Sequence, residues 1–107
     1  MRKIIRFEVT LAAVVLLAGA AGFAQSPGEA IYKAKCTNCH GPAGLANSGI
    51  SMLMKVKPVS DPSVRNMPEE EMVEATRKGM GKMQGYKSEL NDAQIKSVVA
   101  YFRTFVK

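Results

Sequence analysis

The sequence is poor in side chains that bind metals, with one histidine and two cysteines among 107 residues. A structural zinc site needs about four ligands of this kind, so these three residues cannot complete one. With a single histidine, two imidazoles of one chain cannot bind the same metal ion. No segment alternates apolar and polar residues as a half-buried strand does, which predicts an all-α fold class.

Long apolar runs are also missing. The longest, residues 9–24, has 16 residues and falls short of the ~20 that a membrane-spanning helix needs. It lies between a positive start and a small-x-small pattern, as in a signal peptide: Arg2, Lys3 and Arg6 precede it, and Gly22-Phe23-Ala24 closes it. We therefore predict a signal peptide over residues 1–24, export to the periplasm, and one small domain over residues 25–107. A retained N-terminal membrane anchor is the alternative.

The charge of the chain argues against one class of partner. The formal net charge is +6 and falls to +4 without residues 1–24. No basic stripe interleaved with aromatic residues accompanies this charge, so we predict no nucleic-acid binding. A moderate positive charge favours a transient encounter with an acidic patch on a protein partner.

The most informative segment is Cys36-Thr37-Asn38-Cys39-His40. Two thiols three residues apart, followed at once by an imidazole, are typical of covalent haem attachment, in which the sulfurs bond the porphyrin and the histidine ligates its iron. A redox dithiol is the alternative, but such pairs occur in a strand-helix-strand pattern that this sequence lacks. One covalently attached haem c would also supply apolar core to a domain that is small.

Helix-capping signals predict two helices in the first part of the domain. Ser26 and Glu29 form a capping box around Pro27, which predicts a helix to about Cys36. Three glutamates favour the positive end of a helix dipole and predict a helix over about 69–79. Between them we expect a short helix over residues 48–54, whose methionines pack in an apolar cluster, and then a turn-rich connection marked by Pro58, Asp61 and Pro62.

The last helix has the clearest pattern. Asn91 and Gln94 form a capping box, and apolar residues follow at helical spacing: Ile95, Val98, Val99, Phe102, Phe105 and Val106. The segment before it, residues 79–86, contains three glycines and two methionines. Dense glycine disfavours helix and favours a loop that permits close approach. These residues predict three main helices, with short helices and loops between them.

A methionine is the expected second ligand of the iron. His40 leaves one face of a haem iron open, and a thioether sulfur can close it. Packing explains Met72 and the methionines of the short helix at residues 48–54. Met80 and Met83 instead lie in the glycine-rich loop, where no helical pattern requires an apolar residue. One of these two is the predicted axial ligand.

Three segments together resemble the small bacterial class I cytochromes c, a monohaem family: Cys36-Thr37-Asn38-Cys39-His40-Gly41, Gly79-Met80-Gly81-Lys82-Met83 and Val98-Val99-Ala100-Tyr101-Phe102-Arg103. The resemblance covers residues 26–107 and implies the class I cytochrome c fold around one haem. It also implies that Met83 is the axial ligand and that Gly28 and Tyr32 cross the last helix. Gln84 replaces the proline usual in that family, which is expected to loosen the ligand loop. The sequence near Gly49 also lacks the proline whose carbonyl orients the histidine ring in many relatives.

The sequence therefore predicts a soluble, monomeric electron carrier rather than an enzyme. Cys36, Cys39, His40 and Met83 are expected to bind the haem, which cycles between Fe(III) and Fe(II). Acidic redox partners of respiratory or other chains are expected to dock transiently at the haem edge, near six lysines: Lys33, Lys35, Lys55, Lys57, Lys82 and Lys87. The alternatives are a haem-c subunit of a larger periplasmic oxidoreductase complex, and an enzyme or gas sensor with an open iron site.

Overall fold

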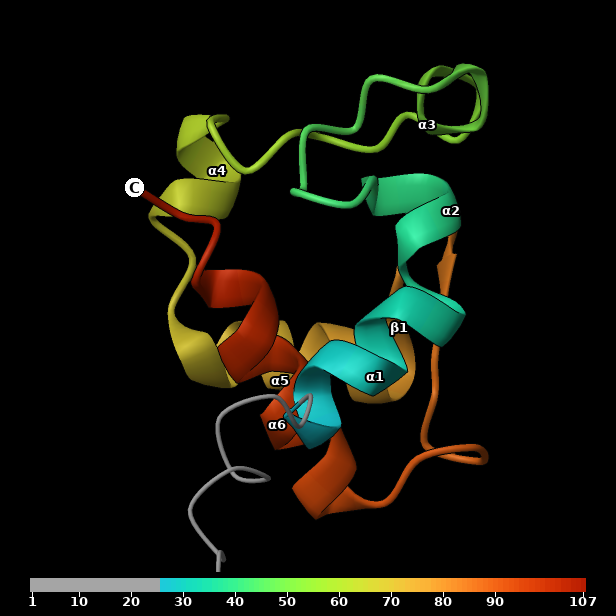
Figure 1. The fold of residues 1–107 in the computed structure, drawn as a ribbon, viewed down its shortest axis with the longest axis vertical. Helices are drawn as coiled ribbons and strands as arrows, with labels where there is room; N and C mark the ends of the chain where they lie inside the picture. Colours follow the sequence, from blue (N-terminus) through green and yellow to red (C-terminus); the bar gives the residue numbers. More distant parts are fainter. Residues whose placement is uncertain (1–25) are drawn as a thin grey trace, which may run out of the picture.

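The structure is a computed structural model that describes residues 26–107, so the predicted signal peptide over residues 1–24 lies outside the described residues. Within the described residues, six helices and one short hairpin follow one another (Figure 1). They are α1 (Pro27–Lys35), α2 (Thr37–His40), α3 (Gly49–Leu53), α4 (Pro62–Arg65), α5 (Glu69–Lys78), β1 (Gly79–Met80), β2 (Met83–Gln84) and α6 (Asp92–Arg103). The three longest helices are the three main helices predicted from the sequence.

The helices begin at the predicted caps. Ser26 accepts a hydrogen bond from the backbone N–H of Glu29 at 3.2 Å, which starts α1. At α6 the capping box is complete, because Asn91 and Gln94 each accept from the other's backbone N–H, at 2.8 and 2.9 Å. These contacts satisfy N–H groups that the first turn leaves unpaired.

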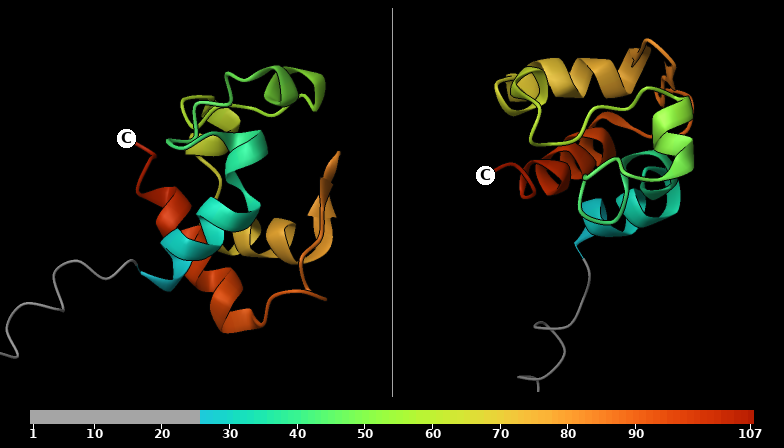
Figure 2. Two further views of the ribbon diagram at one scale, coloured as in Figure 1. Left: turned by 45° about the vertical axis from the view of Figure 1, so that its right-hand side comes forward. Right: turned by 90° about the horizontal axis from the view of Figure 1, so that it is seen from above.

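Helices α1 and α6 cross in close contact at Gly28, as the resemblance implied. A Cβ atom placed on Gly28 would lie 2.0 Å from the carbonyl oxygen of Ser97, so only glycine permits this approach. Tyr32, one turn further along α1, packs its ring 5.4 Å from that of Tyr101. Figure 2 shows the two helices in contact from two further directions. The crossing fixes the direction in which α1 leads into the cysteine segment.

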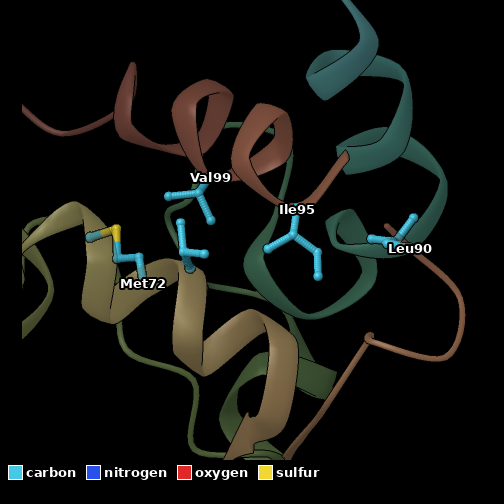
Figure 3. Packing of buried hydrophobic residues seen from close by; sticks show 5 residues of the cluster. Met72, Leu90, Ile95 and Val99 are labelled. Carbon is cyan, nitrogen blue, oxygen red and sulfur yellow. The ribbon is translucent and has the colours of Figure 1, made fainter. Parts of the chain in front are cut away.

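The apolar core lies between α5 and α6. Figure 3 shows Met72 on α5 and Val99 and Ile95 on α6 facing one another, with Leu90 beside them. Val73 completes this cluster, and Ile95 is fully buried. Tyr32 is also almost fully buried, with 1% of its surface exposed. Burial of such side chains contributes about 1.5–3 kcal/mol each, so the cluster holds one wall of the domain in place.

Three local expectations differ from the structure. The connection expected to be rich in turns contains the short helix α4, which Asp61 caps by accepting from the Ser63 N–H and which has Pro62 at its first position. The glycine-rich loop contains the antiparallel pair β1 and β2. The expectation that Met52 packs in an apolar cluster is wrong, because 75% of its surface is exposed. A helix as short as α3 has too few turns to make both faces meet the core.

Candidate functional site

A cavity of about 670 Å³ lies among the helices and the hairpin. Its wall includes residues of α1, α2, α4, α5, both strands and α6, elements that surround the centre of the molecule in Figure 1. Most of the surface that lines it is apolar. Its volume lies in the range of about 300–1,000 Å³ that is usual for cofactor and small-molecule sites.

The cavity brings together all four residues expected to bind the haem: Cys36, Cys39, His40 and Met83. Both cysteines are free and half-buried. Burial raises the pKa of the Cys36 thiol to about 11, with the neighbouring Lys35 acting in the opposite direction. A reactive redox dithiol needs a thiol whose pKa is lowered, so the environment of Cys36 argues against that alternative.

The imidazole of His40 lies on the cavity wall beside Phe102, whose ring centroid is 5.3 Å away. Burial lowers the pKa of His40, so the ring is neutral at pH 7, as ligation of a metal requires. Its Nδ1 atom is buried and has no hydrogen-bond partner within residues 26–107. No carbonyl therefore takes the place of the proline carbonyl of the resembling family.

Three contacts hold the cysteine segment against its neighbours. The Tyr32 hydroxyl donates to the Gly41 carbonyl at 2.6 Å, directly after His40. Ser51, which is fully buried in α3, donates to the Cys39 carbonyl. The Cys36 backbone N–H donates to the Tyr32 carbonyl at 2.9 Å and ends α1. Because the backbone is held on both sides of the segment, its side chains keep one direction relative to the cavity.

The hairpin places its two methionines opposite each other. Met80 of β1 and Met83 of β2 are Cα partners, so their side chains share one face of the ladder, and both line the cavity. The close approach of the two strands requires glycine at the start of β1: Gly79 has φ 91°, and a Cβ there would lie 2.7 Å from the Met83 carbonyl oxygen. The Met80 residue is 56% exposed, whereas Met83 is half-buried. Of the two sulfurs, that of Met83 belongs to the better covered side chain.

The family follows from the sequence as well as from this site. Residues 23–102 match the family described as "Cytochrome C oxidase, cbb3-type, subunit III". The chain belongs to this family of c-type cytochromes. It therefore binds covalently attached haem c, as the cysteine motif predicted. The resemblance to the class I cytochromes c is confirmed.

Two kinds of relative agree with this assignment. The dihydro-heme d1 dehydrogenase of Pseudomonas aeruginosa is 32% identical over 93 residues, which cover 87% of this cytochrome but only 18% of the dehydrogenase. The solved structure of the KustC0563 c-type cytochrome superposes with a TM-score of 0.68 at 23% identity, over 75% of this chain and 98% of that one. A point mutant of the same protein gives a TM-score of 0.66 at 21% identity, over 74% and 98% of the two chains. These structures confirm the cytochrome c fold.

The residues of the cavity fit the haem of this cytochrome in two respects. The two thiols and the imidazole that would attach and ligate a haem all line the cavity, and the imidazole is held with its Nδ1 buried and free of a hydrogen bond to another of residues 26–107. The remaining lining is largely apolar, which matches a macrocycle. Met54, Met67 and Met72 also line the cavity, so Met54 and Met72, which the sequence assigned to packing within the protein, have the haem site as a neighbour as well.

The lysines near the site divide into two groups. Lys35, Lys55, Lys57 and Lys82 line the cavity, and no aspartate or glutamate of residues 26–107 does. The other two lysines named from the sequence, Lys33 and Lys87, are outside its lining, and Lys33 pairs with Glu29 at 3.1 Å. This division could not be predicted from the sequence, because the four lining lysines come from three separate segments.

Proposed function

We propose that this cytochrome is an exported carrier of single electrons with one haem, held by Cys36 and Cys39 and ligated by His40 and Met83. The observation that supports it is the convergence of these four residues, from α2, its N-cap and β2, on one cavity. The bound haem supplies the Fe(III)/Fe(II) couple, and one electron enters or leaves without any bond being made or broken. Methionine as second ligand favours a high reduction potential.

The ligand set also supports a carrier over an enzyme or a gas sensor. With His40 and Met83 both bound, no coordination position on the iron is left for a substrate or a gas. Neutral His40 and a half-buried thioether need no proton to bind or leave during the electron step. The chain's own residues therefore have to position the haem and limit its contact with water.

We place the docking surface for redox partners beside α3. Four apolar side chains there and on the hairpin are more than half exposed: Ile50, Met52, Leu53 and Met80. Lys82 lies next to them, donating to the Leu53 carbonyl at 3.3 Å, and Lys55 follows α3. An apolar patch with cations around it fits an acidic redox protein with an apolar centre, which docks briefly because exposed charges speed encounter more than they tighten binding.

We propose that the protein works in the periplasm, because residues 1–24 have a signal-peptide pattern, and that it does so as a monomer, which the gel-filtration test below addresses. Within residues 26–107, no helix is long and apolar enough to cross a membrane. The export signal and the haem motif support each other, since c-type haem is attached outside the cytoplasm in this family. Purified periplasmic protein should start at Gln25 and contain one haem by mass.

The axial ligand provides the sharpest test. The oxidised protein should show the weak near-infrared charge-transfer band of a sulfur-to-iron bond. Met83→Ala should abolish this band and lower the reduction potential, whereas Met80→Ala, its partner across the hairpin, should keep both. Loss of the band in Met80→Ala alone would transfer the ligand role to Met80. Absence of the band in the unaltered protein would show an open iron site and end the carrier proposal.

The alternative function is a permanent haem-c subunit of a larger oxidoreductase. The exposed apolar side chains of α3 are the observation that favours it, because a permanent partner would cover them. Docking strength separates the two cases. A carrier should run as a monomer in gel filtration and bind its partner in a way that ~0.5 M salt abolishes. A subunit should co-purify with its partner at that salt concentration.

A further inference from the structure

The lining of the haem cavity carries positive charges that belong to none of the four haem-binding residues. The lining contains four lysines and no carboxylate among the residues that the structure describes. A haem carries two propionate carboxylates, so it brings negative charge that these cations can neutralise. Buried or half-buried carboxylates need such partners, because desolvation of an unpaired charge is costly. The question is which lysine meets them.

The chemistry of the haem restricts the answer. Its two vinyl groups and its two propionates lie on opposite edges of the macrocycle, and the vinyl edge is bonded to Cys36 and Cys39. The propionates therefore point toward the cavity wall far from α2. Helix α4 forms that wall: it lies across the centre of the molecule from α2 in Figure 1 and again in the view from above in Figure 2.

Two of the four lysines are engaged elsewhere. Lys35 is directly next to Cys36, on the vinyl side, and pairs with Glu89 at 3.5 Å. Lys82 donates to the Leu53 carbonyl at 3.3 Å. Lys55 lines the cavity from the loop after α3. Lys57 differs from all three because its ammonium is held at the α4 end of the cavity by a residue of α4.

That residue is Ser63. The Lys57 ammonium donates to the Ser63 hydroxyl oxygen at 3.3 Å, and both residues line the cavity. The Ser63 hydroxyl in turn donates to Asp61 Oδ1 at 2.6 Å, and the same oxygen accepts from the Ser63 backbone N–H at 2.9 Å. Asp61 thus fixes the hydroxyl of Ser63, and Ser63 presents only its oxygen to Lys57. Two N–H groups of the ammonium are left to donate.

We propose that Lys57 binds a haem propionate at the α4 end of the cavity, and that Ser63 is a positioning residue that holds its ammonium there. This inference depends on the haem attachment in the proposed function, but not on the choice between Met80 and Met83. Asp61 stays negatively charged, because two hydrogen bonds from Ser63 lower its pKa, but its Oδ1 atom already accepts both of them, and the Lys57 ammonium donates to Ser63 rather than to Asp61.

The test is the pH dependence of the reduction potential of the haem-loaded protein, which changes slope where a propionate gains its proton. A cation within 4–6 Å lowers the pKa of a carboxyl group by ~1–3 units. Lys57→Gln should therefore raise the pH of this change by about one unit, the low end of that range, because Lys57 is exposed to solvent. Lys57→Arg should restore it, and Ser63→Ala should shift it less, in the same direction.

Lys55→Gln is the matched control, since it removes the same charge from the cavity lining two residues away. The remaining charged groups of the site, Lys35, Lys82 and Asp61, stay unchanged in every variant. No shift in Lys57→Gln, or an equal shift in Lys55→Gln, would overturn the assignment. The near-infrared band of each variant is recorded in parallel: its presence shows that the haem ligands are intact, so a failure of this inference is distinct from a failure of the ligand set.

Discussion

The substitution Gly28→Ala tests the helix crossing on which the site depends. The added methyl carbon would meet the Ser97 carbonyl oxygen at 2.0 Å, the Ser97 carbonyl carbon at 2.6 Å and Tyr101 Cβ at 3.1 Å. Ordinary contact between such atoms begins near 3.4 Å. Two of the three atoms belong to backbone that cannot rotate away. Helices α1 and α6 therefore have to separate by more than an ångström to accept the methyl group.

The cost of this separation can be placed within limits. Overpacking a close contact costs about 1–3 kcal/mol, and we take the upper end because the obstacle is backbone. Alanine is better than glycine in a helix by about 1 kcal/mol, which offsets part of the cost. The expected net loss is about 2 kcal/mol of unfolding free energy, a large share of the stability of a small domain.

Gly49→Ala provides the matched control. Gly49 is also in a helix, α3, but a Cβ there meets nothing within 4 Å. This variant should match the unaltered protein or gain up to ~1 kcal/mol. Unfolding of the haem-loaded proteins by guanidinium, followed by far-ultraviolet circular dichroism and by haem absorbance, measures both. A Gly28→Ala protein as stable as the Gly49→Ala protein would show that α1 and α6 do not meet as described.

Two further predictions concern single hydrogen bonds. Tyr32→Phe removes the buried bond to the Gly41 carbonyl and should cost about 1 kcal/mol at pH 7. Burial also raises the pKa of Tyr32 above its ordinary value of 10.0. The unfolded chain therefore loses this proton at a lower pH than the folded protein, and stability falls as the pH rises above about 10. Between pH 7 and ~10.5, the unfolding free energy should fall less in Tyr32→Phe than in the unaltered protein. Asn91→Ala removes the cap of α6 and should lower the unfolding free energy by ~1 kcal/mol, measured by thermal or guanidinium unfolding. Asn91→Ser should keep most of this stability, because serine is also a good N-cap residue.

The sequence predicted well the features that depend on contacts between residues close together along the chain. The caps at Ser26 and Asn91 are local, because the partner N–H groups are three residues away. The cysteine motif is local as well, and it indicated the cofactor before any fold was known. Helix α4 has the same start signal as α1, an N-cap followed by proline, but with four residues it has no periodicity to support the signal. Pro62, together with Pro58 and Asp61 before it, therefore indicated a turn-rich connection.

What the sequence could not predict depends on segments that meet across the fold. The exposure of α3 depends on which of its sides has a neighbour: the buried Ser51 bonds this five-residue helix to Cys39, while Ile50, Met52 and Leu53 are more than half exposed. The grouping of lysines around the cavity has the same origin. Lys57 lies six residues from Ser63, but whether the two face the haem depends on how the loop between α3 and α4 is folded.

The hairpin also changes the expectation for Gln84. A proline stiffens a ligand loop by fixing its own φ, and its absence was expected to loosen the loop around Met83. Here Gln84 lies opposite Gly79 in the two-stranded ladder. The backbones approach so closely that a Cβ on Gly79 would lie 2.7 Å from the Met83 carbonyl oxygen, and one on Gly85 would lie 2.6 Å from the Lys78 carbonyl carbon. The Tyr86 N–H then donates to the Thr76 carbonyl of α5 at 2.9 Å. Strand pairing and the hydrogen bond to α5 thus restrain the loop in place of the proline usual in the resembling family. We therefore expect Met83 to keep its position although residue 84 is glutamine.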